Sequence, residues 1–113
     1  MSQITTHVLD TSLGKPAANV PVVLELQTAG NEWKKLGHGV TDNDGRLKNL
    51  LGTDILAAGT YRLTFDTSAY FADRGLKAFY PQVLITFEVT NSREHHHVPL
   101  LLSPYGYSTY RGS

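Results

Sequence analysis

Residues 20–27 read VPVVLELQ, and the alternation in this stretch decides the fold. In an extended chain one face carries Val22, Leu24 and Leu26, and the other carries Val23, Glu25 and Gln27. A period of two is typical of a β-strand that buries one of its faces. We therefore expect a strand here, with its apolar face packed against a second layer.

Neighbouring segments extend the same pattern. Residues 33–41 (WKKLGHGVT) follow as a partner strand, and residues 61–65 (YRLTF) and 83–89 (VLITFEV) alternate again. The apolar positions of these last two segments are Tyr61, Leu63, Phe65, Val83, Ile85, Phe87 and Val89. Several short alternating strands favour an all-β architecture.

Residues 41–47 (TDNDGRL) have the composition of a tight turn, in which Gly45 meets the requirement for a positive φ. We expect the turn to present Arg46 at the end of a hairpin. Asp42 and Asp44 could form an acid–base pair. Turns ordinarily use aspartates to bind their own backbone amides, so the turn interpretation is favoured.

Residues 66–76 (DTSAYFADRGL) predict one short helix among the strands. Asp66 or Thr67 would cap its start, and Gly75 would close its end. One short helix and many strands predict a β-sandwich of two antiparallel sheets. A chain of 113 residues fits a single domain, which we place over residues 1–113.

Residues 94–104 (EHHHVPLLLSP) carry the main indication of an assembly. As a strand, one face presents His96, Val98, Leu100 and Leu102, and the other presents His95, His97, Pro99 and Leu101. The first face has core composition, while the proline on the second favours an edge position or an unpaired amide. Because this second face is also partly apolar, we expect a symmetric oligomer to cover it, with His97 at or near a subunit boundary.

Composition excludes several classes of function. Ten Lys and Arg balance ten Asp and Glu, so the attraction that drives binding to nucleic acids or anionic lipids is missing. No stretch approaches the ~18 apolar residues of a membrane span. The chain has no cysteine and therefore no thiolate nucleophile. The first residues do not resemble a secretory signal, so we expect a cytoplasmic protein, or a periplasmic one only if a signal peptide has been removed.

The histidine run permits a metal site. His95 and His97 are two apart on one strand face, and His7 could be a third ligand. With no matching carboxylates, surface or interface histidines are the favoured interpretation, and we expect no metal. His38 is expected to be structural. A serine triad is not expected either, because no recognisable nucleophile setting surrounds Ser103, Ser108 or Ser113.

Three segments carry a family resemblance, namely residues 7–17 (HVLDTSLGKPA), 41–47 (TDNDGRL) and 97–113 (HVPLLLSPYGYSTYRGS). In this order, and over nearly the whole chain, they resemble the 5-hydroxyisourate hydrolases of the transthyretin-like family. The resemblance implies a transthyretin-type sandwich and a homotetramer with active sites at subunit interfaces along a central channel. It also implies hydrolysis of 5-hydroxyisourate to 2-oxo-4-hydroxy-4-carboxy-5-ureidoimidazoline in urate degradation, without metal or cofactor.

The functional positions of that family are filled here by His7, Arg46, His97, Tyr110, Arg111, Gly112 and Ser113. The resemblance implies that the first three are catalytic, and that His7, Arg46 and the tail residues 110–113 bind substrate. The tail would extend into the channel, with Tyr110 over the substrate plane. His96 departs from the pattern, because similar enzymes often have tyrosine there.

The residue types suit the reaction. Hydrolysis of a ring amide needs a base to activate water, a donor for the charge on the carbonyl oxygen, and an acid for the leaving nitrogen. Two imidazoles, which titrate near neutral pH, can be the base and the acid, and a guanidinium can bind a flat imide-like edge. The sequence leaves open which histidine is the base, and we favour His97.

Two other functions compete with this one. A transthyretin-type carrier would bind a small molecule in the same channel and catalyse nothing. Such carriers lack the two histidines, the DGR arginine and the YRGS ending, all of which are present here. A structural or interaction module would carry an incidental histidine run, and His97→Ala would then have no effect on any activity.

Overall fold

The structure is a computed structural model that describes residues 3–52 and 55–113. The predicted strand of residues 20–27 forms as β3 (Pro21–Gln27), with Val22 and Leu24 buried. β3 lies inside a four-stranded sheet of order β4-β3-β6-β7, in which all pairings are antiparallel. The other strands are β4 (Trp33–Val40), β6 (Gly59–Phe65) and β7 (Val83–Val89). The four strands predicted from alternation are thus confirmed.

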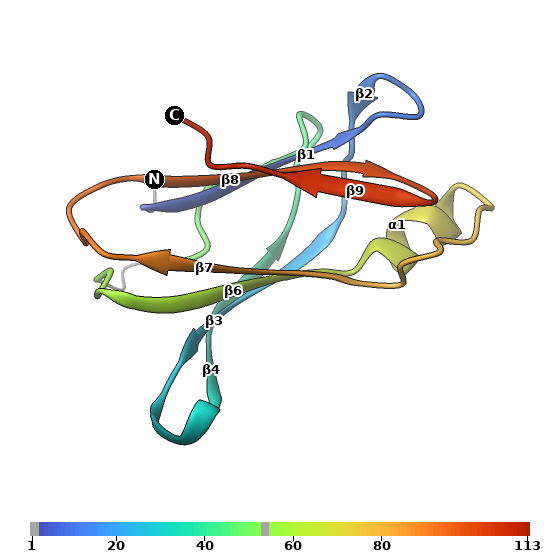
Figure 1. Ribbon diagram of the computed structural model, residues 1–113. Helices are drawn as coiled ribbons and strands as arrows, with labels where there is room; N and C mark the ends of the chain where they lie inside the picture. Colours follow the sequence, from blue (N-terminus) through green and yellow to red (C-terminus); the bar gives the residue numbers. More distant parts are fainter. Residues whose placement is uncertain (1–2, 53–54) are drawn as a thin grey trace.

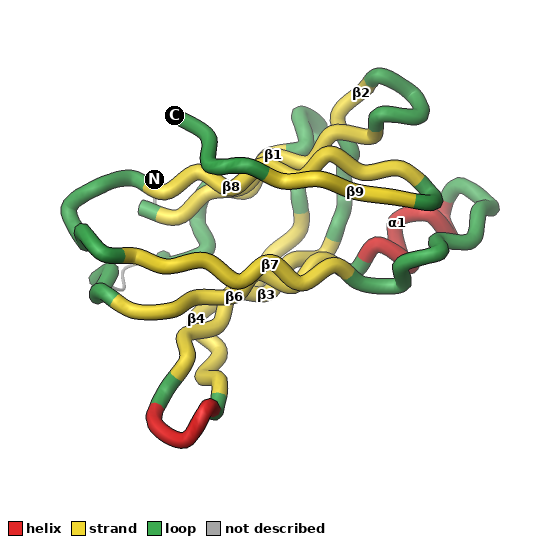
Figure 2. The backbone as a smooth tube through the Cα atoms, in the orientation of Figure 1, coloured by secondary structure: helices red, strands yellow, loops and turns green. Residues whose placement is uncertain are grey.

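A second sheet has the order β2-β1-β8-β9, with the short β5 also paired to β1. Its strands are β1 (Ile4–Asp10), β2 (Lys15–Pro16), β5 (Arg46–Leu47), β8 (His96–Ser103) and β9 (Gly106–Thr109). The two sheets form two layers, and the hairpin of β3 and β4 extends beyond them (Figure 1). A single 3-10 turn, η1 (Ala29–Asn31), closes that hairpin at its tip (Figure 2).

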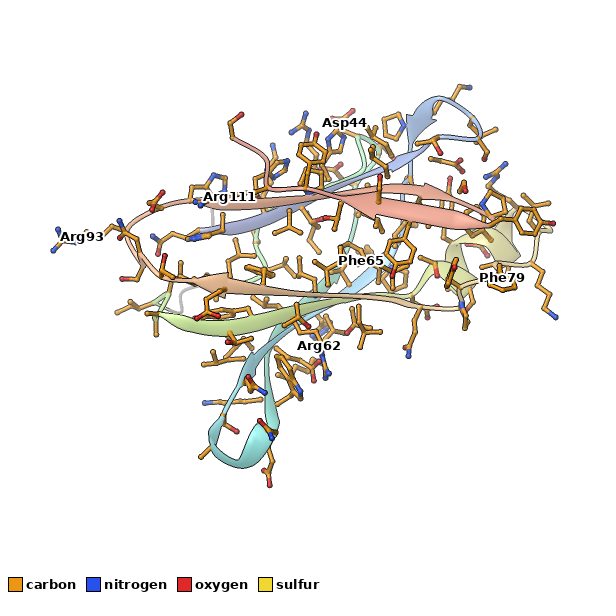
Figure 3. The ribbon with its side chains drawn as sticks, viewed as in Figure 1. Asp44, Arg62, Phe65, Phe79, Arg93 and Arg111 are labelled. Atoms are coloured by element: carbon orange, nitrogen blue, oxygen red, sulfur yellow. The ribbon has the colours of Figure 1, made fainter. Side chains whose placement is uncertain are left out.

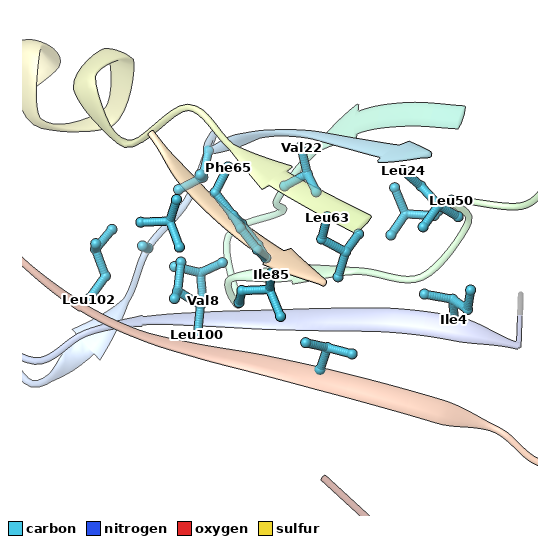
Figure 4. Packing of buried hydrophobic residues seen from close by; sticks show 14 of the residues in the cluster. Ile4, Val8, Val22, Leu24, Leu50, Leu63, Phe65, Ile85, Leu100 and Leu102 are labelled. Carbon is cyan, nitrogen blue, oxygen red and sulfur yellow. The ribbon is translucent and has the colours of Figure 1, made fainter. Parts of the chain in front are cut away.

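The core fills the space between the layers. Val8 and Leu100 come from one sheet, and Leu63, Phe65 and Ile85 come from the other (Figure 4). Figure 3 likewise shows Phe65 between the sheets, whereas Arg62, on the same strand, lies on the outer side. The inner residues expected of β8 are also buried. The predicted sandwich of two facing sheets is confirmed.

One strand pairing differs from the expected antiparallel sheets, because β1 and β8 run parallel. Antiparallel order follows naturally where a short hairpin joins two strands. β1 and β8 come from opposite parts of the chain, so no hairpin dictates their relative direction. Their register pairs Thr5 with His97 and His7 with Pro99.

Helix α1 (Thr67–Asp73) confirms the predicted short helix. The carboxylate of Asp66 caps its start by accepting a hydrogen bond from the backbone N–H of Ala69 at 3.0 Å. At its end Gly75 has a φ of 71°, and the N–H of Leu76 reaches back to the carbonyl of Phe71. Among the described residues, no helix is long and apolar enough to cross a membrane.

The turn before β5 forms, but the predicted hairpin is wrong. Asp42 binds the backbone N–H groups of Asp44 and Arg46, and Gly45 has a φ of 75°. β4 belongs to one sheet, yet β5 joins the other, where Arg46 lies opposite His7. The turn therefore carries the chain from one layer to the other, and the carbonyl of Gly45 accepts a hydrogen bond from the N–H of Val8 on β1 at 2.7 Å.

Of the two settings expected for Pro99, an edge strand or an unpaired amide, the structure shows the second, because β8 lies between β1 and β9. Pro99 is tolerated there because of where β9 ends. The ladder with β9 stops at the pair of Leu100 and Thr109, and the next bridge on that side joins His97 to Gly112. Pro99 falls between the two, where no backbone N–H is needed, and its carbonyl accepts from the Thr109 hydroxyl at 2.7 Å.

A buried polar cluster joins β1 to α1. The side chain of Asp10 is fully buried and accepts hydrogen bonds from the Ser12 hydroxyl at 2.5 Å and the Tyr70 hydroxyl at 2.7 Å, and it forms an ion pair with Arg74. Burial alone would raise the pKa of Asp10, but these bonds lower it below its ordinary value. Burial, together with the bond to Asp10, raises the pKa of Tyr70 to about 12.

Candidate active site

Three neighbouring strands bring the predicted catalytic side chains to one face of the second sheet. Val8 on β1 and Leu100 on β8 point into the core, so Thr5 and His7 on β1 and His97 on β8 point outward. The parallel register places Thr5 beside His97, and β5 adds Arg46 beside His7. His7, Arg46 and His97 therefore share the outer face, although about 90 residues separate the first from the last.

These strands border a cleft of about 140 Å³. Its lining consists of Thr5, Thr6, Arg46, Lys48, His95, His97 and Ser113. No Asp or Glu side chain is among the described residues that line it, and Arg46 and Lys48 add positive charge, so its side chains suit an anionic or carbonyl-rich ligand. Lys48 was not predicted as a site residue. It lies two residues after Arg46 in an extended segment, and this spacing indicates that both side chains share one face.

The last residues of the chain lie over the start of β8, where Figure 1 shows the C-terminal segment. The N–H of Gly112 donates to the carbonyl of His97 at 2.8 Å, and Ser113 borders the cleft. Arg111, labelled in Figure 3, instead reaches Glu94 at 3.3 Å. Tyr110 borders a neighbouring hollow of about 250 Å³ between β7 and β8. The predicted tail residues are thus near His97, but they divide between two hollows.

The ring of His7 is fixed by a backbone carbonyl. Its Nε2 lies 2.9 Å from the carbonyl oxygen of Asp44, at the turn labelled in Figure 3. A carbonyl oxygen only accepts, so His7 Nε2 must carry a proton. In the neutral ring Nδ1 is then the nitrogen that can exchange a proton with a ligand.

His97 is half-buried, and its Nδ1 lies 2.8 Å from the hydroxyl oxygen of Thr5. Burial lowers the pKa of His97, and electrostatic interaction with His7, His95 and Arg46 lowers it further. The imidazole is therefore neutral at pH 7. A neutral imidazole beside cations has the protonation state that a general base requires.

The metal and carboxylate alternatives gain no support from the described part of the chain. His95 and His97 have their ring centroids 6.3 Å apart, with the Thr5 hydroxyl bonded to both rings. Within residues 3–52 and 55–113, no group of three potential ligands is arranged to hold a metal ion. Bonds from the backbone of Arg46 and Asp44 lower the pKa of Asp42, as expected of a turn aspartate.

Comparison with known proteins places this arrangement in a family. Residues 4–112 match the family model described as HIUase/Transthyretin family. The chain belongs to the HIUase/transthyretin family. A 5-hydroxyisourate hydrolase of Salmonella dublin is 49% identical over 110 residues, which cover 97% of this chain and 80% of the relative.

Solved structures of the HIUase/transthyretin family include both an enzyme and a thyroxine complex. The 5-hydroxyisourate hydrolase of Klebsiella pneumoniae matches with a TM-score of 0.86 and 39% identity, covering 100% of both chains. Sea bream transthyretin in complex with thyroxine matches with a TM-score of 0.92 and 32% identity, covering 98% of this chain and 95% of that one. Because both share the sandwich, the fold cannot separate the functions, and the side chains of the cleft must.

The contact between Gly112 and His97 gives a first prediction. A Cβ at position 112 would lie 2.5 Å from Cδ2 of His97, so Gly112→Ala must displace either the ring or the tail. We expect kcat to fall by roughly 10- to 100-fold, because misplacing a reacting group by about 1 Å has effects of that size. Gly106→Ala is the matched control, since its Cβ would meet only the Ser103 hydroxyl at 3.8 Å. Equal turnover by the two variants would contradict the prediction.

Proposed function

We propose that this chain hydrolyses 5-hydroxyisourate to 2-oxo-4-hydroxy-4-carboxy-5-ureidoimidazoline in urate degradation. The observation that carries the proposal is the meeting of His7, Arg46 and His97 on one outer face, in a chain whose relatives are named 5-hydroxyisourate hydrolases. A non-catalytic carrier is not favoured, because it would need none of these side chains. The same proposal treats residues 1–113 as one domain.

In the proposed reaction, His97 removes a proton from a water molecule, which attacks a ring carbonyl and breaks the adjoining C–N bond. Negative charge develops on the carbonyl oxygen, where Arg46 and Lys48 supply fixed positive charge. The leaving nitrogen receives a proton from an imidazole, for which His7 is the candidate. The carbonyl of Asp44 holds the His7 ring in the same orientation whether Nδ1 carries a proton or not.

The tail completes the proposed substrate site. Ser113 already borders the cleft, and the bridge from Gly112 to His97 holds the preceding residues beside it. Tyr110 would turn over the flat ring of the substrate from the neighbouring hollow, and Arg111 would contribute a further cation. These roles for residues 110–113 are part of the proposal, which requires neither metal nor cofactor.

The proposal includes a homotetramer with active sites at subunit interfaces. The outer face that carries the cleft also carries Leu9 and Leu101, both half-buried in the single chain. Packing of this face against another copy would cover the two leucines and narrow the cleft into a channel. Specific activity that falls on dilution, in parallel with dissociation seen by sedimentation, would support this part.

The cytoplasm is the proposed compartment, which cell fractionation can test.

The proposed function is tested by generating 5-hydroxyisourate in place from urate with a purified urate oxidase. Its decay is followed by absorbance with no protein, with the wild type, and with a variant lacking residues 110–113. We expect rapid decay with the wild type and a rate close to the uncatalysed one with the truncated chain. Uncatalysed decay in the presence of folded wild-type protein would overturn the proposal, and a binding screen with thyroxine-like ligands would follow.

The protonation of His97 gives a second prediction. If neutral His97 is the base, kcat/KM rises as the pH increases through its pKa, and it falls again at higher pH once the acid that protonates the leaving nitrogen has lost its own proton. Since burial and nearby cations hold this pKa below the ordinary 6.5, the midpoint of the acidic limb is expected below pH 6.5. Initial rates from pH 5 to 8, corrected for spontaneous decay, give the profile. A midpoint at or above 6.5 would mean that another group, or a His97 with a raised pKa, controls the rate.

A further inference from the structure

The hydroxyl of Thr5 lies between two imidazoles of the cleft. Its oxygen is 2.8 Å from Nδ1 of His97 and 3.0 Å from Nε2 of His95, and both distances fit hydrogen bonds. Thr5 is only 3% exposed, and the parallel register of β1 and β8 holds it opposite His97. Thr5 is therefore a fixed contact between the two rings.

A count of protons makes these two contacts interdependent. A threonine hydroxyl has one hydrogen to donate and two lone pairs that accept, so it can donate to only one of the two imidazoles, and the other must present N–H to it. When Thr5 donates to one neutral ring, that ring presents a bare nitrogen. The tautomer of His95 and the tautomer of His97 are then set together.

We propose that Thr5 and His95 are positioning residues that set the tautomer of His97. In this arrangement His97 Nδ1–H donates to Thr5, and the Thr5 hydroxyl donates to Nε2 of His95. The remaining nitrogen, Nε2 of His97, is then left without a proton. The inference rests on the proposed function, because it specifies how His97 is prepared to act as the base.

The surroundings of the two rings favour this direction over the reverse one. His95 is exposed, so water can accept from its Nδ1–H, whereas His97 is half-buried. The Cδ2 edge of His97, which is the edge next to Nε2, faces Gly112 and thus the tail. Nδ1 is already occupied by Thr5, so Nε2 is the nitrogen available to a ligand in the cleft.

The arrangement also explains how the proton is held during the reaction. The lone pair of His97 Nε2 takes a proton from water, and the electron pair of the broken O–H bond stays on the oxygen that attacks the carbonyl. The imidazolium then donates more strongly through Nδ1–H, and Thr5 accepts more strongly because its own proton is given to His95. The proton on Nε2 later returns to solvent, while His7 protonates the leaving nitrogen and regains a proton from solvent, so no other reactant is needed.

The Thr5 hydroxyl is a neutral partner for His97, and this agrees with the charged groups that surround the His97 ring. The titratable or cationic side chains around the ring are His7 on β1, Arg46 on β5, Lys48 after β5 and the neighbouring His95, and Ser113, whose carboxyl group is also titratable, borders the same cleft. No described Asp or Glu side chain lines the cleft to take the place that a carboxylate has in many hydrolase triads. A threonine and a histidine orient the ring without raising its affinity for protons as an anion would.

The first test compares Thr5→Val, which has the same shape without the hydroxyl, with Thr5→Ser, which retains it. We expect Thr5→Val to lower kcat by roughly 10- to 100-fold, as is usual for the loss of a partner that orients an imidazole, with KM changed less than about twofold. Thr5→Ser should remain within about threefold of the wild type. In Thr5→Val the acidic limb of the pH profile should also move to lower pH, because the imidazolium has lost its acceptor.

The second test does not depend on turnover. The ring nitrogens of ¹⁵N-histidine-labelled protein are observed by NMR at pH 8, with His97 and His95 assigned from His97→Gln and His95→Gln. We expect His97 to be protonated at Nδ1 in the wild type and to shift toward the Nε2–H form in Thr5→Val. A wild-type His97 protonated at Nε2 would overturn the inference, as would an unchanged kcat and pH profile in Thr5→Val. Because the NMR measurement does not require turnover, it tests the tautomer of His97 even if the protein has no hydrolase activity.

Discussion

Replacing His97 by glutamine is expected to lower kcat/KM for 5-hydroxyisourate by roughly two to four orders of magnitude, the usual contribution of a general base. Glutamine is close to histidine in size and can still hydrogen-bond to Thr5, so the strand and the tail bridge should keep their places. It cannot take a proton from water. Steady-state rates with substrate generated in place, corrected for spontaneous decay, measure the effect.

His38→Gln is the matched control for this variant. His38 is exposed on β4, in the opposite sheet, and takes no part in the cleft. We expect it to retain wild-type turnover and the same unfolding midpoint as His97→Gln. If His97→Gln kept more than a tenth of the wild-type kcat/KM, His97 would not be the base, and His7 would be examined in the same way.

The largest effect on stability is expected from Asp10→Ala. The change leaves the hydroxyl of Tyr70 buried without its acceptor, and it removes the acceptor of the Ser12 N–H and the ion-pair partner of Arg74. Breaking a buried pair on one side typically destabilises by about 3–5 kcal/mol. For a domain of this size, that corresponds to a fall of roughly 10–20 °C in the midpoint of thermal unfolding. Calorimetry or circular dichroism at a fixed protein concentration measures it.

The control for Asp10→Ala is Asp66→Ala, which removes an aspartate at the start of the same helix. Asp66 is exposed and mainly caps the helix through Ala69, so we expect a loss of only about 1 kcal/mol. The pKa of Asp10 lies below its ordinary 3.8, so its contribution is present above that pH and is lost as the pH falls below it. A difference from the wild type under 1 kcal/mol at pH 7 would show that Asp10 is not a principal link between β1 and α1.

Alternation identified the strands of the first sheet because each of them buries one apolar face. The same method did not identify β1, since its inward face includes Thr6 and Asp10 as well as Ile4 and Val8. The buried polar groups are satisfied by partners distant in sequence, such as the carbonyl of Val98, which accepts from the Thr6 hydroxyl at 2.6 Å. Those partners cannot be read from the local pattern.

Sequence motifs predicted that His7, Arg46, His97 and the tail belong to the site, but they did not predict how these residues are arranged in space. The predicted hairpin at Arg46 was wrong because β5 pairs with β1, a strand distant in the sequence, and the composition of the turn does not show that pairing. The pairing of Thr5 with His97 depends on a register between distant strands, so no local pattern could have indicated it.

The parallel pairing of β1 with β8 has a consequence for biosynthesis. The contact between Thr5 and His97 spans 92 positions in the sequence, whereas the β3–β4 hairpin of the first sheet forms from neighbouring segments. At typical translation rates, roughly 5–20 s pass between the synthesis of β1 and that of its partner. During that interval Ile4 and Val8 have no β8 to cover them on the ribosome. A chaperone that binds short apolar segments would find β1 available, and the catalytic face would be completed only after the last strands have emerged.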